Sequence, residues 1–198
     1  MKQDWNYLQI KDMYLKKGYK FYDSGAYNVN IGGIRNPSTE VDKFNDLIFV
    51  AYLDEFRNQQ CLLFAATTKP GLTYLKDKLG SADGTAILIP GQYPKSLVLG
   101  LHNQGTPHEH KAFRQAGPGV FKVWRDKNSD GKLDYSGKIY DDVKGLNLHT
   151  TREFQVSRVG GFSAACQVVE DDKEHRILIS VGERSAELYS NLFTYTLF

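Results

Sequence analysis

Apolar residues in this chain fall in short runs separated by turn-forming residues, a pattern typical of a protein rich in β-strands. The two clearest runs are residues 47–53 (LIFVAYL) and 61–67 (CLLFAAT). The polar segment 54–59 between them predicts a hairpin that is buried on at least one face. Further strands are predicted at residues 19–27, 29–34, 86–89, 97–101, 120–124 and 193–198, and in the apolar runs that begin near residues 146 and 166.

Fewer segments favour helices. Residues 4–17 mix apolar and charged positions, with Asp4 as a candidate N-cap and Gly18 as the stop. Residues 107–116 (PHEHKAFRQA) favour a second helix, with Pro107 in its first turn. Shorter helical segments are predicted at residues 72–79 and 182–192, the latter after a charged turn at 170–174 and an apolar run at 177–181.

Many short strands with two or three short helices predict a mainly β or α+β fold. The chain has 198 residues and fits one domain, because single hydrophobic cores extend to about 250 residues. No internal repeat or low-complexity linker divides residues 1–198. The 12 Tyr and 11 Phe agree with a strand-rich domain, since aromatic side chains suit pleated, half-buried surfaces.

The charge and hydropathy of the chain argue against two classes of function, nucleic-acid binding and membrane spanning. The formal net charge of +2 comes from 25 basic and 23 acidic residues that are mixed along the chain, which argues against a nucleic-acid partner because such binding needs clustered Lys and Arg. No apolar stretch approaches the roughly 20 residues of a membrane span. The N-terminal segment MKQDWNYLQIKD lacks the apolar region of a secretory signal, so we expect the protein to be made in the cytoplasm.

Candidate chemistry concentrates in residues 146–169 (LNLHTTREFQVSRVGGFSAACQVV), where His149 ends a short apolar run and Cys166 begins another. A thiol with a pKa of about 8.5 is only a few per cent thiolate at neutral pH. A nearby imidazole stabilises the thiolate as an ion pair and then carries the proton. The pattern therefore predicts a Cys166 nucleophile with His149 as general base and acid. The alternative is an inert core thiol, which is how we interpret Cys61 in its predicted strand.

The order of residues in this stretch resembles the catalytic motif of the L,D-transpeptidase (YkuD-like) family. That motif has His-Gly-Ser/Thr, a glycine-containing loop, and Ser-x-Gly-Cys followed by an apolar residue and Arg. Leu148-His149-Thr150, Gly160-Gly161 and Ser163-Ala164-Ala165-Cys166 occur in the same order, and Cys166 follows His149 by 17 positions.

Three positions depart from the family motif. Thr150 stands where the family has Gly, Ala165 stands where it has the Gly before the nucleophile, and Gln167-Val168 stands where it has the apolar residue and Arg. The last difference removes the arginine expected to recognise a carboxylate.

The resemblance implies a compact YkuD-like β-rich domain whose motif-bearing region spans about residues 118–198, and a substrate among the stem peptides of bacterial peptidoglycan. It also implies roles for individual residues: Cys166, His149 and Ser163 in catalysis, and Thr150, Gly161 and Ala165 at the substrate.

Other histidines are weaker candidates. His102 ends the apolar run 97–101 much as His149 ends its own, which places it as a possible further substrate contact in the same cleft; a surface or satisfied histidine is the alternative. His108 and His110 are two positions apart on the predicted helix 107–116, a spacing that does not put them on one face, so we predict no zinc site there.

A second constellation lies in residues 126–134, DKNSDGKLD. Its oxygen side chains and glycine match the first nine positions of an EF-hand-type calcium loop. The predicted ligands are Asp126, Asn128, Asp130, the carbonyl of Lys132, and Asp134, with Asp141 or Asp142 as a source of the missing carboxylate. The twelfth position is Gly137 rather than Glu, and a polar hairpin tip is the alternative. A structural calcium ion here would fix the strand that leads to His149.

The sequence thus predicts a peptidoglycan-active cysteine enzyme. An acyl-enzyme resolved by an amine gives a cross-link, and one resolved by water gives a cut peptide. The missing signal and motif arginine favour hydrolysis, as in a phage lysin, a virion-associated wall hydrolase or a secreted effector that reaches the wall after lysis, injection or specialised secretion. The alternative is a non-enzymatic phage or surface module that keeps the fold and binds glycan or a partner through its tyrosines.

Overall fold

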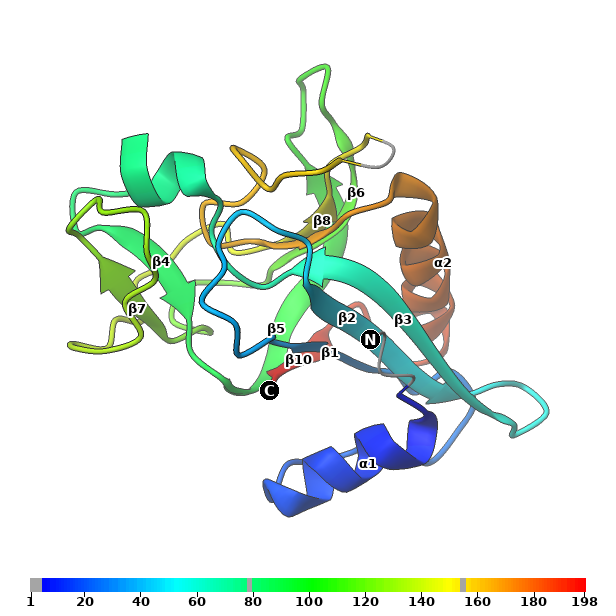
Figure 1. Ribbon diagram of the computed structural model, residues 1–198. Coiled ribbons are helices and arrows are strands. Elements are labelled where there is room, and N and C mark those ends of the chain that lie inside the picture. Colours follow the sequence, from blue (N-terminus) through cyan, green and yellow to red (C-terminus); the bar gives the residue numbers. More distant parts are fainter. Residues whose placement is uncertain (1–4, 78–79, 154–155) are drawn as a thin grey trace.

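The computed structural model describes residues 5–77, 80–153 and 156–198 (Figure 1). Two α-helices, one π-helical turn and ten strands follow in this order within those residues: α1 (Tyr7–Lys16), β1 (Asn30–Ile34), β2 (Asp46–Leu53), β3 (Gln59–Thr67), η1 (Thr73–Asp77), β4 (Thr85–Leu88), β5 (Gly91–His102), β6 (His110–Gln115), β7 (Val123–Asp126), β8 (Leu148–Thr150), β9 (Gln167–Val169), α2 (Asp172–Leu188) and β10 (Phe193–Leu197). The predicted mainly β or α+β class is confirmed.

Eight strands form a closed barrel in the order β1, β10, β5, β6, β8, β9, β3 and β2, with β2 pairing back to β1. The C-terminal strand β10 closes the barrel by pairing in parallel with β1 and antiparallel with β5. Strands β4 and β7 form a separate two-stranded sheet beside the barrel (Figure 1). In the described chain no helix is both long and apolar enough to cross a membrane.

The continuous apolar run in β2 is explained by burial on both faces. Ile48 and Val50 point into the barrel core, whereas Phe49 and Ala51 pack against helix α1 on the outside. Figure 1 shows α1 lying across this side of the barrel. The hairpin predicted from residues 47–67 is confirmed, with β2 and β3 paired antiparallel along their lengths.

Helix α1 begins and ends by recognisable caps. The Asn6 side chain accepts a hydrogen bond from the backbone N–H of Gln9 (3.0 Å), and the Gln9 side chain accepts one from the Asn6 N–H (2.9 Å). Gly18 follows the helix with φ +68°, so it is the stop that the sequence predicts. The candidate cap Asp4 lies outside the described residues.

The predicted helix at 107–116 is wrong, because this segment contains strand β6. Residues His110–Gln115 pair with Leu97–His102 of β5, and Phe113 also pairs with Leu148 of β8. Burial of Ala112 and Phe113 in the barrel wall outweighs the helix-compatible composition. The consequence reaches the functional site, since His110 now lies opposite His102.

The strand predicted at 19–27 is also absent from the described structure, in which this segment is irregular. Side-chain amides, instead of a neighbouring strand, bond to backbone groups of this segment. The Asn30 amide bonds to the backbone N–H and C=O of Tyr22, and the Gln92 amide does the same for Lys20.

The apolar run 177–181 lies within helix α2, where a Cβ on Gly182 would collide with the ring of Phe113.

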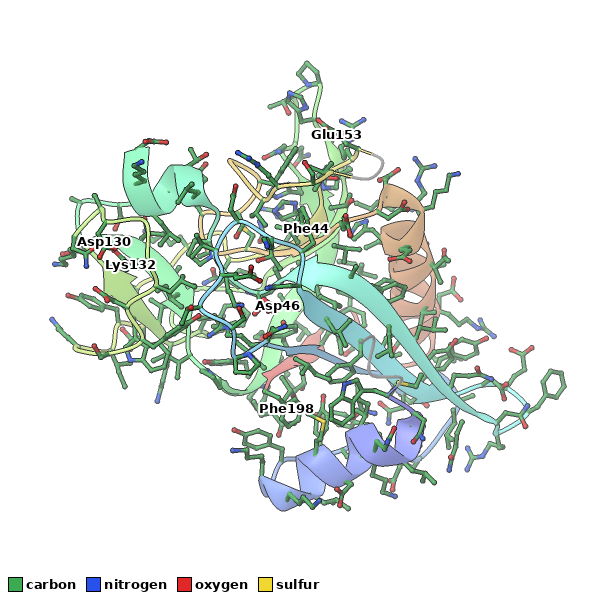
Figure 2. The ribbon with its side chains drawn as sticks, in the orientation of Figure 1. Phe44, Asp46, Asp130, Lys132, Glu153 and Phe198 are labelled. Carbon is green, nitrogen blue, oxygen red and sulfur yellow. The ribbon has the colours of Figure 1, made fainter. Side chains whose placement is uncertain are left out.

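A buried ion pair joins the first residue of β2 to the segment that follows β3. Asp46 and Lys69 are both almost wholly buried, with 3.1 Å between Oδ1 and Nζ. Asp46 also accepts hydrogen bonds from the N–H and hydroxyl of Thr68 (2.7 and 2.8 Å), so the carboxylate is well satisfied. Figure 2 shows Asp46 near the middle of the molecule, where this network holds the segment that leads into η1.

Candidate active site

Parallel pairing of β8 with β9 brings the two halves of the motif together. His149 lies in the middle of β8 opposite Val168, and Cys166 directly precedes β9. The turn before Cys166 is closed by Ser163, whose hydroxyl donates to the Cys166 carbonyl (2.7 Å). The fold therefore brings His149 and Cys166 to the same cleft although 17 positions separate them.

Both residues line one cleft of about 420 Å³. Of the residues predicted from sequence, Cys166, His149, His102, Thr150 and Gly161 lie in its wall. Ser163 is fully buried and Ala165 nearly so, and neither is part of this wall, so their side chains shape the turn instead of facing a substrate. The cleft wall also contains Tyr74 and Arg152, which the sequence did not single out, and His110, which the sequence placed on a helix.

The Cys166 thiol is held as a neutral group. Its Sγ donates to the Gly145 carbonyl (3.3 Å) and accepts from the Asn147 N–H (3.5 Å). Burial raises the pKa of Cys166 to about 11, and the Asn147 N–H lowers it only in part. This differs from the predicted ion pair, which required a Cys166 pKa below its ordinary value.

His149 is held neutral as well. Its side chain is 4% exposed, and its Nδ1 donates to the Thr150 carbonyl (2.9 Å), which leaves Nε2 as the basic nitrogen. Burial, with His102 close by, lowers the pKa of His149 to about 3. In the described residues no hydrogen bond joins His149 to Cys166, a common state of catalytic pairs before substrate binds.

His102 faces the same cleft and stacks on His149, with ring centroids 4.2 Å apart and an angle of 17° between the planes. Asn147 orients it. The Asn147 Oδ1 accepts from the Gln115 N–H (2.9 Å), so its Nδ2 donates to His102 Nδ1 (3.1 Å). His102 Nδ1 is therefore an acceptor, and its proton is on Nε2.

Two further histidines extend this cluster. His110 lies 5.1 Å from His102 and His175 lies 6.1 Å from His110, measured between ring centroids. The Nε2 atoms of His110 and His175 are buried without a hydrogen-bond partner. Sequence reasoning missed both: His110 was placed on a helix, and His175 is contributed by α2 from a different part of the chain. In the described part of the chain no group of three or more His, Cys, Asp or Glu side chains is arranged to hold a metal.

The fold and this cleft define a β-barrel protein in which a cysteine and a histidine line one cleft. Comparison of the chain with protein-family models, with curated proteins and with solved structures gave no match. The geometry described above is therefore the basis for the function proposed below.

The neutral resting pair predicts how Cys166 reacts with an alkylating agent. In a Cys61→Ala background, the rate of alkylation by iodoacetamide should rise about tenfold per pH unit from pH 7 to 9, because the thiolate fraction of a group with a pKa near 11 is still growing there. Mass spectrometry of the labelled peptide measures the rate. An alkylation rate that stops rising at or below pH 8.5 would contradict the neutral Cys166–His149 pair and would support the predicted ion pair instead.

The buried histidines predict loss of stability in acid. The pKa values of His149 and His175 are lowered to about 3, below the value of about 6.5 in the unfolded chain. The unfolded state therefore binds more protons below pH 6.5, and stability falls as the pH drops from there toward 3. Each histidine should cost on the order of 2 kcal/mol at pH 5.

Urea denaturation at pH 7 and pH 5 measures this effect. His175→Gln should reduce the difference in unfolding free energy between the two pH values by about 2 kcal/mol. The exposed His108, replaced by Gln, is the matched control and should leave that difference unchanged. An undiminished difference in His175→Gln would mean that the buried ring does not titrate as described.

Proposed function

We propose that this protein is a cysteine-dependent enzyme that cleaves stem-peptide bonds of bacterial peptidoglycan. The observation that carries the proposal is the β8–β9 pairing, which brings Cys166 and His149 from separate segments into one cleft. The order of residues in the motif supports the substrate class through its resemblance to L,D-transpeptidases. A cleft of about 420 Å³ is within the range that holds a short peptide segment.

His149 acts as a general base in this proposal. When a peptide carbonyl approaches, Nε2 of His149 takes the proton from the Cys166 thiol as sulfur attacks the carbonyl carbon. The same proton then passes to the leaving amine as the C–N bond breaks, which leaves a thioester on Cys166. Water attacks the thioester, His149 takes a proton from that water, and the peptide carboxylate leaves as the thiol is restored.

Developing negative charge on the carbonyl oxygen needs hydrogen-bond donors. The backbone N–H groups of Ala165 and Cys166 donate no hydrogen bond in the part of the chain that is described. Ser163 fixes the turn that carries them through its bond to the Cys166 carbonyl. We assign these two N–H groups as the oxyanion donors, because preorganised donors at this position stabilise the tetrahedral intermediate.

Arg152 supplies the cation that the motif lacks at Val168. It lies in the cleft wall, and its Nη1 donates to the Pro107 carbonyl (2.6 Å), which anchors the side chain to the β5–β6 hairpin. We assign it to the carboxylate of the stem peptide, since a guanidinium binds carboxylates through several donors. Hydrolysis is the proposed outcome, on wall reached after lysis, injection or specialised secretion.

A non-enzymatic module that binds glycan or a partner is the second candidate. One observation favours it: the neutral Cys166 thiol, with a pKa raised to about 11, is also what an inert buried cysteine would have. Turnover of a defined substrate distinguishes the two.

Cys166→Ala should abolish release of new amino groups from purified peptidoglycan, because no other group in the site forms the acyl-enzyme. The unfolding midpoint should change by only a few degrees, since the side chain is partly exposed. Cys61→Ala is the matched control: Cys61 packs beside α1, away from the cleft, and its replacement should keep turnover. Full activity in Cys166→Ala, or no activity in the parent protein, would exclude the enzyme in favour of the binding module.

Arg152→Gln should raise KM at least tenfold for a stem peptide with a free carboxylate, with kcat changed less, because the lost ion pair contributes mainly to binding. The same peptide with an amidated carboxyl group should show no difference between parent and variant. Steady-state kinetics on the two peptides provide the measurement. An equal loss on both would mean that Arg152 supports the hairpin only.

A further inference from the structure

The loop that follows β7 begins at a buried carboxylate with one unpaired oxygen. Asp126 ends β7 and is fully buried, and its Oδ1 has no hydrogen-bond donor. Its other oxygen, Oδ2, accepts from the N–H of Asp134 (3.3 Å), so the carboxylate faces the inside of the loop. A buried carboxylate oxygen without a donor is costly, and native structures usually satisfy such groups.

We propose that residues 126–134 bind a calcium ion through the side chains of Asp126, Asn128, Asp130 and Asp134 and the carbonyl of Lys132. The unpartnered Oδ1 of Asp126 is the observation that raises this loop above an ordinary polar turn. Calcium takes six to eight oxygen ligands, and alternate residues of such a loop supply them. Gly131, at φ +77°, makes the sharp bend that this wrapping requires.

The charges around Asp126 also call for a cation. The carboxylates of Asp134 and Asp130 lie close enough to that of Asp126 to repel it when all three are ionised. The basic residues on either side of Asp126 in the sequence pair with other carboxylates: Arg125 with Asp142 (2.9 Å) and Lys127 with Asp83 (3.4 Å). Asp142, one of the two additional ligands predicted from the sequence, is thus already paired in this structure.

Binding requires a local rearrangement of the loop, because its carboxylates are not gathered closely enough in this structure to hold a metal ion. Asn128 donates from Nδ2 to Asp134 Oδ2 (3.0 Å), and Lys132 donates from its N–H to Asp130 Oδ1 (2.9 Å). Rotation of the Asn128 amide releases the Asp134 carboxylate and turns the Asn128 oxygen toward it. Because no glutamate stands at position 137, water completes the shell, and we expect a dissociation constant of about 10⁻⁴ to 10⁻³ M.

The ion would support the wall of the cleft. The N–H of Gly131 donates to the carbonyl of Leu75 in η1 (3.2 Å), and the adjacent Tyr74 lines the cleft with Cys166. Figure 2 shows Asp130 and Lys132 on the side of the molecule that carries the β4–β7 sheet, next to η1. The sequence placed this support on the strand leading to His149, whereas the structure connects the loop to η1.

The test is thermal unfolding of the chelator-stripped full chain in calcium chloride at constant ionic strength. Saturating calcium, about a hundredfold above the dissociation constant, should raise the unfolding midpoint by roughly 5 to 10 °C. Magnesium chloride should give a much smaller rise, because magnesium demands tighter octahedral geometry. Asp130→Ala and Asp134→Ala should each remove the calcium effect. Asp12→Ala, which removes the same charge from the exposed face of helix α1, should retain it.

A parent protein that calcium does not stabilise would overturn the site. So would an equal shift in both loop variants and Asp12→Ala, or equal shifts with calcium and magnesium, since each points to general charge screening. Two loop variants allow for one that fails to fold. The readout needs no enzymatic activity, so its result is independent of the proposed function.

Discussion

The parallel pairing of β8 with β9 is the constraint on which the cleft depends. Each strand has three residues, so the pair cannot hold itself together by hydrogen bonds alone. Its position comes from the neighbours, because Phe113 of β6 pairs with Leu148 and Ala66 of β3 pairs with Val169. The barrel thus fixes the positions of His149 and Cys166, and Arg152 and Gly161 from the segment between them line the cleft.

The burial of His149 and Cys166 also determines their protonation states. The same barrel wall that positions His149 removes it from water, which lowers its pKa, and removes Cys166 from water, which raises its pKa. Desolvation thus acts on the two groups in the direction that keeps both neutral. An ion pair would need a dry site to hold two charges, whereas general-base transfer creates charge only as the substrate reacts.

The local sequence pattern predicted those elements whose burial can be read from their own residues. The hairpin at 47–67, the C-terminal strand and the His149–Cys166 motif were all readable, because apolar runs and turn residues mark them. Strand β6 was not, since the burial of Ala112 and Phe113 depends on partners from β5 and β8. Asn147 could not be recognised from the sequence for the same reason, because its role depends on contacts between strands. Its side chain bonds to Gln115 of β6 and to His102 of β5.

The two walls of the cleft differ in what holds them. One wall belongs to the barrel, whose strands are paired on both sides. The other is η1, which is attached by the bond from Gly71 N–H to the Ser163 carbonyl (2.9 Å), by the Thr85 hydroxyl on the Tyr74 carbonyl, and by Gly131 on Leu75. A few bonds from short loops open at lower free energy than a barrel wall. Entry of a substrate is therefore expected to move η1 with Tyr74, while His149 and Cys166 stay in place.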